Sequence, residues 1–198
     1  MKSFYENDVF NEKDFAQLKE IALNQLNSDE LLFAESYSRY YIVTHFPKEI
    51  KEKIISLANQ KFGREDLDIV YTHTVKYQIV DDIAPNLKSH KDNLPATHTL
   101  DICIDTTMPN WGLSVENEFF PDKPNSVIYL QGNEDVHWRP EYPSNDKADY
   151  CILFLVNLAP PDHWGFKVLK SLESMPEYLR KRMSDQLIPH SRKRDHNK

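Results

Sequence analysis

The first third of the chain carries hydrophobic residues at helical spacing. In residues 12–26, apolar side chains recur every three or four positions and form one face. Residues 48–62 repeat this pattern between Pro47 and Gly63, residue types that favour the start and the end of a helix. Between the two predicted helices, residues 36–46 are rich in β-branched and aromatic residues and favour a strand.

Beyond residue 66 the helical spacing gives way to short β-rich runs. Clusters of Pro, Asn, Asp and Gly separate them, and the runs comprise residues 68–80, 97–104, 126–130 and 149–156. Helices followed by about six to eight short strands predict an α+β domain built around a β-sandwich or barrel. The irregular connections between the runs favour a jelly roll over a simple meander.

We expect a single domain, because 198 residues suffice for one compact core and fall short of what two domains normally need. Its predicted parts are a mainly helical stretch over 1–65, a jelly-roll core over 66–158, and a C-terminal loop, helix and basic tail over 159–198. The helix is predicted at 171–187. The tail from residue 190 has no apolar content and is expected to be solvated.

The acidic balance of the chain disfavours nucleic acid as a partner. There are 24 basic and 31 acidic side chains, a net charge of −7, whereas phosphates need a basic face.

No apolar run approaches the roughly 20 residues that span a bilayer, and the acidic start does not fit a signal peptide, so we expect a cytoplasmic protein with no membrane contact. Only four glycines occur, which excludes clustered phosphate-binding loops. Cys103 and Cys151 lie in strand-like runs and are expected to be free and buried.

Three residues have the spacing of a metal site. His90 and Asp92 are two positions apart, so that in an extended segment both side chains point to the same face. His137 follows another strand-like run. Two imidazoles and one carboxylate form the ligand set of non-haem Fe(II) oxygenases, which holds the iron on one side and leaves the other side open. On spacing alone, the same residues also fit a surface loop and a turn.

The segments 90–92 (HKD) and 136–139 (VHWR) carry a family resemblance. With the order of strands over residues 66–158, they resemble the double-stranded β-helix core of the Fe(II)/2-oxoglutarate-dependent dioxygenases and the HWR signature of its small hydroxylase-like members. The resemblance implies Fe(II) bound by His90, Asp92 and His137, with 2-oxoglutarate as co-substrate. It favours hydroxylation over halogenation, because halogenating relatives replace the carboxylate ligand with a small residue.

The resemblance also implies a cation for the far carboxylate of 2-oxoglutarate. Relatives use an arginine or lysine, commonly some ten residues past the distal histidine, and Lys147 occupies that position here. Arg139, two residues past His137, is the alternative. Tyr77 is similar to the tyrosine that often hydrogen-bonds this carboxylate in relatives, and Tyr71 and Tyr129 are its alternatives.

The function predicted from these residues is an Fe(II)- and 2-oxoglutarate-dependent hydroxylase acting on a small molecule, an amino acid or a peptide side chain. The alternative is a non-catalytic or differently metallated cupin-like binding protein. Nucleic-acid demethylation by the same chemistry ranks third, because the run 148–156 contains no arginine for a basic groove. The sequence does not reveal the substrate or the oligomeric state.

Overall fold

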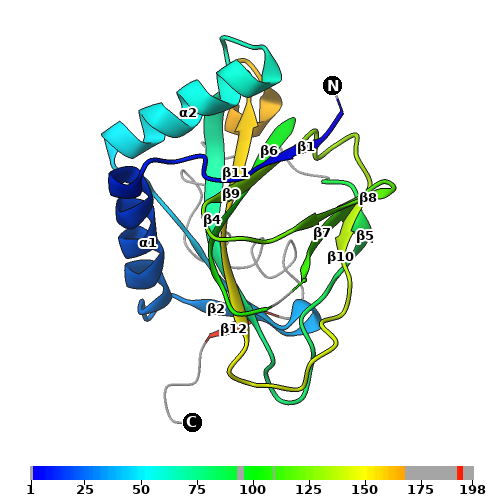
Figure 1. The fold of residues 1–198 in the computed structure, drawn as a ribbon. Helices are drawn as coiled ribbons and strands as arrows, with labels where there is room; N and C mark the ends of the chain where they lie inside the picture. Colours follow the sequence, from blue (N-terminus) through cyan, green and yellow to red (C-terminus); the bar gives the residue numbers. More distant parts are fainter. Residues whose placement is uncertain (1, 93–95, 109, 168–190, 194–198) are drawn as a thin grey trace.

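A computed structural model describes residues 2–92, 96–108, 110–167 and 191–193. Two antiparallel β-sheets and two α-helices make up most of this part of the chain (Figure 1). In spatial order, the large sheet contains β1 (Phe4–Glu6), β9 (Ser126–Leu130), β6 (His98–Thr106), β11 (Tyr150–Ala159), β4 (Asp68–Gln78), β3 (Arg39–Val43), β2 (Leu32–Ala34) and β12 (Ser191–Lys193). The small sheet contains β5 (Leu87–His90), β10 (His137–Arg139), β7 (Gly112–Val115) and β8 (Glu118–Pro121).

Two helices cover the outer face of the large sheet. Helix α1 (Glu12–Leu26) begins at Asn11, whose side chain accepts a hydrogen bond from the backbone N–H of Asp14. Helix α2 (Lys48–Phe62) follows Pro47 and ends at Gly63, which has a φ of 63°, a left-handed conformation that favours glycine. Both helices are confirmed within the predicted limits.

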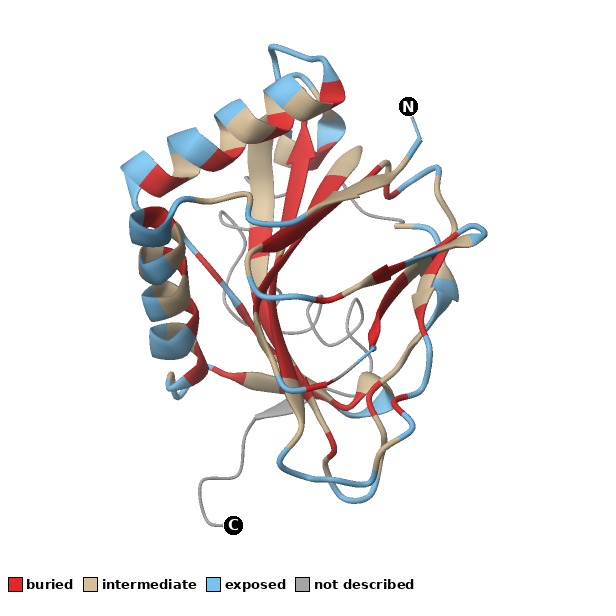
Figure 2. Cartoon of the chain, in the orientation of Figure 1, coloured by how far each residue is buried: buried red, intermediate tan, exposed pale blue. Residues whose placement is uncertain are grey.

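The helices bury their apolar faces against the sheet. Figure 2 shows buried residues on the side of each helix that faces the strands and exposed residues on the opposite side. The members of this cluster from the two helices include Leu18, Ala22, Ile50, Ile54 and Ala58. They pack with side chains of β6, β9 and β11, among them Leu100, Ile102, Val127, Phe154 and Val156. This packing makes the large sheet a rigid support for whatever its inner face carries.

A second cluster fills the space between the two sheets. Its buried members include Val75, Tyr77, Trp111, Tyr142 and Leu153. Cys103 and Cys151 belong to it and are free and buried, as predicted. Side chains of β7 and β8 pack separately with Ile128 and Leu130 of β9. The inner face of the large sheet is therefore closed over part of its length by the small sheet.

The strands outside residues 66–158 differ from the sequence prediction. The predicted strand at 36–46 is present as β3, but β1 and β2 also join the large sheet, although the first 65 residues were expected to be mainly helical. Residues 191–193 pair with β2, so this part of the tail is not the free, solvated segment that the sequence predicts. Edge pairing supplies backbone hydrogen bonds that composition does not reveal. The helix predicted at 171–187 lies outside the described residues.

No helix among residues that the structure describes is both long and apolar enough to cross a membrane.

Candidate metal centre

The structure brings His90, Asp92 and His137 together. His90 ends β5, Asp92 follows two residues later, and His137 begins β10, where its Cα pairs with that of His90. The Nε2 atoms of His90 and His137 lie 3.6 and 3.5 Å from Oδ1 of Asp92. One ligand atom from each residue lies within 4.8 Å of the others. Strand pairing thus converts a separation of almost fifty residues in sequence into one potential ligand set.

Backbone carbonyls fix the orientation of both imidazoles. Nδ1 of His90 lies 2.7 Å from the carbonyl oxygen of Lys88, and Nδ1 of His137 lies 2.9 Å from that of Asp135. A carbonyl only accepts hydrogen bonds, so each Nδ1 is the protonated nitrogen. Nε2, the nitrogen that faces Asp92, is left with a lone pair for a metal.

Asp92 is held by its backbone and by a neighbouring hydroxyl. Its N–H donates to the carbonyl of Gly132 at 2.7 Å, and Oγ1 of Thr99 donates to Oδ2 of Asp92 at 3.2 Å. The same hydroxyl lies 3.2 Å from Oδ1 of Asn157. A Cβ on Gly132 would lie 2.9 Å from Cγ of Asp92 and 3.0 Å from Oγ1 of Thr99, so only glycine leaves room for the carboxylate. The sequence analysis did not identify Thr99, Asn157 or Gly132.

The charges of the cluster favour an ionised Asp92. Burial opposes ionisation, but the imidazoles of His137 and His90, which face the carboxylate, outweigh it and hold the pKa of Asp92 below its usual range. Burial lowers the pKa of His137, whereas Asp92 raises it, and the net result is a raised pKa. One carboxylate and two imidazoles are a ligand set that suits Fe(II) and other divalent transition metals, with further positions open for ligands.

Arg139 is not free to bind a ligand in this structure. Its guanidinium is buried and pairs with two carboxylates, those of Asp101 on β6 and of Asp122. The group also lies over the rings of Tyr77 and Trp111, 5.5 and 5.1 Å from their centroids. Asp101 and Asp122 together carry two formal negative charges against the single positive charge of Arg139, which leaves an excess of negative charge between the sheets.

Lys147 lies at the surface. Its ammonium pairs with Asp82 at 2.7 Å, and both side chains are mostly exposed. Hydrogen bonding to Asp82 raises the pKa of Lys147. The structure therefore does not bring Lys147 to the metal-ligand cluster, and its role as co-substrate anchor stays a prediction.

The three tyrosines occupy different places. Tyr77 is buried between the sheets, and its hydroxyl accepts a hydrogen bond from Nη1 of Arg39 at 2.9 Å. Tyr71 lies on β4. Burial and the charge of Asp92 raise its pKa, although the charge of Arg39 opposes the rise. Tyr129 packs in the cluster under the helices and stacks on Phe4, on the outer side of the large sheet. Tyr77 and Tyr71 remain candidates for contact with a ligand.

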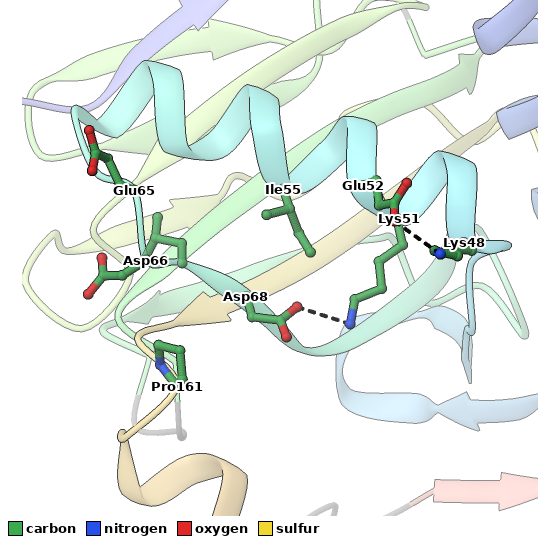
Figure 3. A pocket seen from close by; sticks show the side chains of 9 residues that line it. Lys48, Lys51, Glu52, Ile55, Glu65, Asp66, Asp68 and Pro161 are labelled. Carbon is green, nitrogen blue, oxygen red and sulfur yellow. Dashed lines mark ion pairs between the residues drawn. The ribbon is translucent and has the colours of Figure 1, made fainter.

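An open hollow between α2 and the start of β4 has different chemistry (Figure 3). Its lysines are paired with acids, Lys51 with Asp68 at 3.0 Å and Lys48 with Glu52 at 3.8 Å. The lining contains no histidine or cysteine. These paired, solvent-facing charges do not form a metal site.

His98 gives the protein an expected sensitivity to acid. Burial and the nearby charge of Arg64 lower the pKa of His98 to about 4. Between the usual histidine pKa of about 6.5 and this value, the unfolded chain binds more protons, so this contribution to stability falls as the pH falls. We expect His98→Gln to lose less stability than the parent protein between about pH 7 and pH 4 in urea unfolding. The exposed His45→Gln is the control, and equal losses in all three proteins would contradict the prediction.

Comparison with solved structures places the fold. The epimerase SnoN from nogalamycin biosynthesis, a non-haem α-ketoglutarate-dependent enzyme, matches with a TM-score of 0.62 and 9% identity over 80% of this chain and 77% of that chain. The viral collagen prolyl hydroxylase of Paramecium bursaria Chlorella virus-1, solved as its 2-oxoglutarate complex, matches with a TM-score of 0.57 and 10% identity. The match covers 80% of this chain and 96% of that chain. This chain has the fold of the 2-oxoglutarate-dependent oxygenases.

A prolyl-4-hydroxylase from Pseudomonas putida shares this oxygenase fold, with a TM-score of 0.58 and 10% identity over 80% of this chain and 92% of that chain. No protein-family model matches the sequence, and no curated protein sequence is similar to it. The predicted α+β class with a double-stranded β-helix core is confirmed, and the N-terminal helices pack against one sheet of that core. Identities this low establish the fold, and the ligands and reaction require their own argument.

Proposed function

We propose that the protein is an Fe(II)- and 2-oxoglutarate-dependent oxygenase that hydroxylates a small molecule, an amino acid or a peptide side chain. The observation that carries the proposal is the cluster of His90, Asp92 and His137 on an oxygenase fold. Structural neighbours include an α-ketoglutarate-dependent epimerase and a viral prolyl hydroxylase solved in complex with 2-oxoglutarate. A cytoplasmic location and a single domain belong to the same proposal.

The residues of the chain would prepare the site in three ways. The carbonyls of Lys88 and Asp135 hold both imidazoles in the tautomer that presents Nε2 to the metal. Thr99 orients the carboxylate of Asp92. His90, Asp92 and His137 would hold Fe(II) through three ligand atoms, and further positions on the metal would be open to a chelating co-substrate. When bound, Fe(II) and 2-oxoglutarate would activate O₂, so that one oxygen atom enters a C–H bond of the substrate and the other enters succinate as 2-oxoglutarate loses CO₂.

An anaerobic titration tests the proposal. Metal-free protein receives Fe(II) and then 2-oxoglutarate, and we expect the weak visible charge-transfer band of the chelate to appear. His137→Ala should abolish the band because it removes one of three ligands, whereas the exposed His45→Ala should keep it. A folded parent protein without the band would contradict the proposal and favour the cupin-like binding protein. Succinate formation on admission of O₂ would then distinguish an enzyme from a binding protein that retains the site.

A further inference from the structure

This inference rests on the proposed function and concerns the second carboxylate of 2-oxoglutarate. A keto acid that chelates a metal through one end leaves the other carboxylate to be neutralised inside the barrel, because burying an unpaired charge is costly. Arg139 already faces two carboxylates, and Lys147 is exposed and paired with Asp82. The structure offers a different cation.

Arg39 is that cation. It begins β3, and its Cα pairs with that of Tyr77 on β4. Its guanidinium lies over the rings of Tyr37 and Tyr77, 4.9 and 5.7 Å from their centroids. Of the arginines whose side chains the structure describes, Arg64 and Arg139 have carboxylate partners and Arg39 has none. Its Nε is buried and has no hydrogen-bond partner among the described residues.

Arg39 lies on the inner face of the large sheet, on the same face as alternate residues of β4. Residues 71, 73, 75 and 77 alternate along β4 and share one face, and the buried Val75 and Tyr77 show that this face points between the sheets. At the other end of the row, Tyr71 pairs with Asn157, whose side chain is 3.2 Å from the hydroxyl of Thr99 that holds Asp92. The row therefore runs along the inner face of the large sheet, from the level of Asp92 to that of Arg39.

We infer that Arg39, together with the hydroxyl of Tyr77, binds the carboxylate of 2-oxoglutarate that points away from the metal. The Tyr77 oxygen accepts a hydrogen bond from Nη1 of Arg39, which leaves the phenolic proton to donate to the carboxylate. The remaining guanidinium N–H groups can bind a carboxylate in a bidentate manner. Tyr77 thus keeps the role that the sequence predicts, and its cationic partner comes from a strand that precedes the jelly-roll segment.

The test compares two keto acids by calorimetry on Mn(II)-loaded protein, without substrate and without turnover. One is 2-oxoglutarate, and the other is 2-oxovalerate, which has the same chain length with a methyl group in place of the far carboxylate. We expect Arg39→Gln to weaken 2-oxoglutarate binding about 10- to 100-fold and to leave 2-oxovalerate binding unchanged. Arg39→Lys should fall between, because it keeps the charge without the fork. Tyr77→Phe, which keeps the ring, should lose about 3- to 10-fold for 2-oxoglutarate alone.

Two controls separate the possible failures. Lys147→Gln should bind both keto acids as the parent protein does, and unchanged Mn(II) affinity shows that each variant is folded at the site. If Arg39→Gln keeps the preference for 2-oxoglutarate, or if Lys147→Gln loses it, the inference is overturned while the proposed function stands. If the parent protein binds no 2-oxoglutarate in the presence of metal, the proposed function itself fails.

Discussion

Replacing Arg139 with methionine is expected to lower the free energy of unfolding by about 3–5 kcal/mol. The substitution leaves the carboxylates of Asp101 and Asp122 buried without a counter-charge. Methionine fills much of the space beside Tyr77 and Trp111, so the loss reports charge more than volume. Urea unfolding at about pH 7 measures it as a lower midpoint with an unchanged slope.

The pH dependence of this loss provides an internal check. Burial, reinforced by the charge of Asp101, raises the pKa of Asp122 to about 6 although Arg139 opposes the rise. A raised carboxyl pKa contributes stability that is present below its unfolded pKa and is lost as the pH rises through about 6. The effect of Arg139→Met should therefore be smaller at about pH 5, where Asp122 takes up a proton more readily.

Substitution of Asp122 with asparagine tests the effect of the second buried carboxylate by itself. Asp122→Asn leaves the one-to-one pair of Arg139 and Asp101, and we expect it to change stability by less than about 1 kcal/mol or to stabilise the protein at neutral pH. Combining Asp101→Asn and Asp122→Asn with Arg139→Met should recover a large part of the loss. An Arg139→Met protein that unfolds at the parent's urea concentration would show that these charges are not buried together in solution.

Replacing Gly132 with alanine is expected to weaken metal binding about 10- to 100-fold. The added methyl group would collide with the carboxylate of Asp92 and press on the hydroxyl of Thr99. Asp92 is attached to the same turn by the hydrogen bond from its N–H to the carbonyl of Gly132, so it cannot move away without disturbing that bond. Titration of the metal-free protein with Mn(II) measures the effect.

Substitution of Gly63 with alanine is the matched control for Gly132→Ala. It ends α2 with a φ of 63°, and no atom lies within 4 Å of the position of an added Cβ. Gly63→Ala should cost about 1–2 kcal/mol of stability through backbone strain and leave the metal affinity unchanged. Equal metal affinities for Gly132→Ala and the parent protein would refute the role of Gly132, whereas a loss confined to Gly132→Ala would support it.

The candidate ligands could be predicted because their chemistry is local. His90 and Asp92 share a face through strand alternation alone, and His137 stands directly after a turn that a strand precedes. The helices were predictable for the same reason, since their spacing and end residues are adjacent in sequence. The sequence also contained a partial indication of the position of Thr99. Alternation along residues 98–106 places Thr99 on the same face of its strand as Asp101.

The charge partners could not be predicted because strand register decides them. Arg139 meets Asp101 and Asp122 only once β6 and β10 face each other, and nothing near Arg139 in sequence indicates two buried acids. In the sequence, Arg39 is a single basic residue among aromatic residues, and nothing beside it indicates a buried position. Its interior position follows from its pairing with Tyr77. Pairings between distant strands carry this information.

The central position of β11 has a consequence for protein synthesis. β11 lies between β4 and β6, and the sheet cannot close until the ribosome has passed residue 159. All three predicted ligands are translated earlier. A nascent chain that stops before β11 therefore carries every ligand and lacks the strand that joins the two halves of the large sheet. We expect metal to be acquired only after β11 has paired with β4 and β6, since long-range pairing of this kind forms late and slowly.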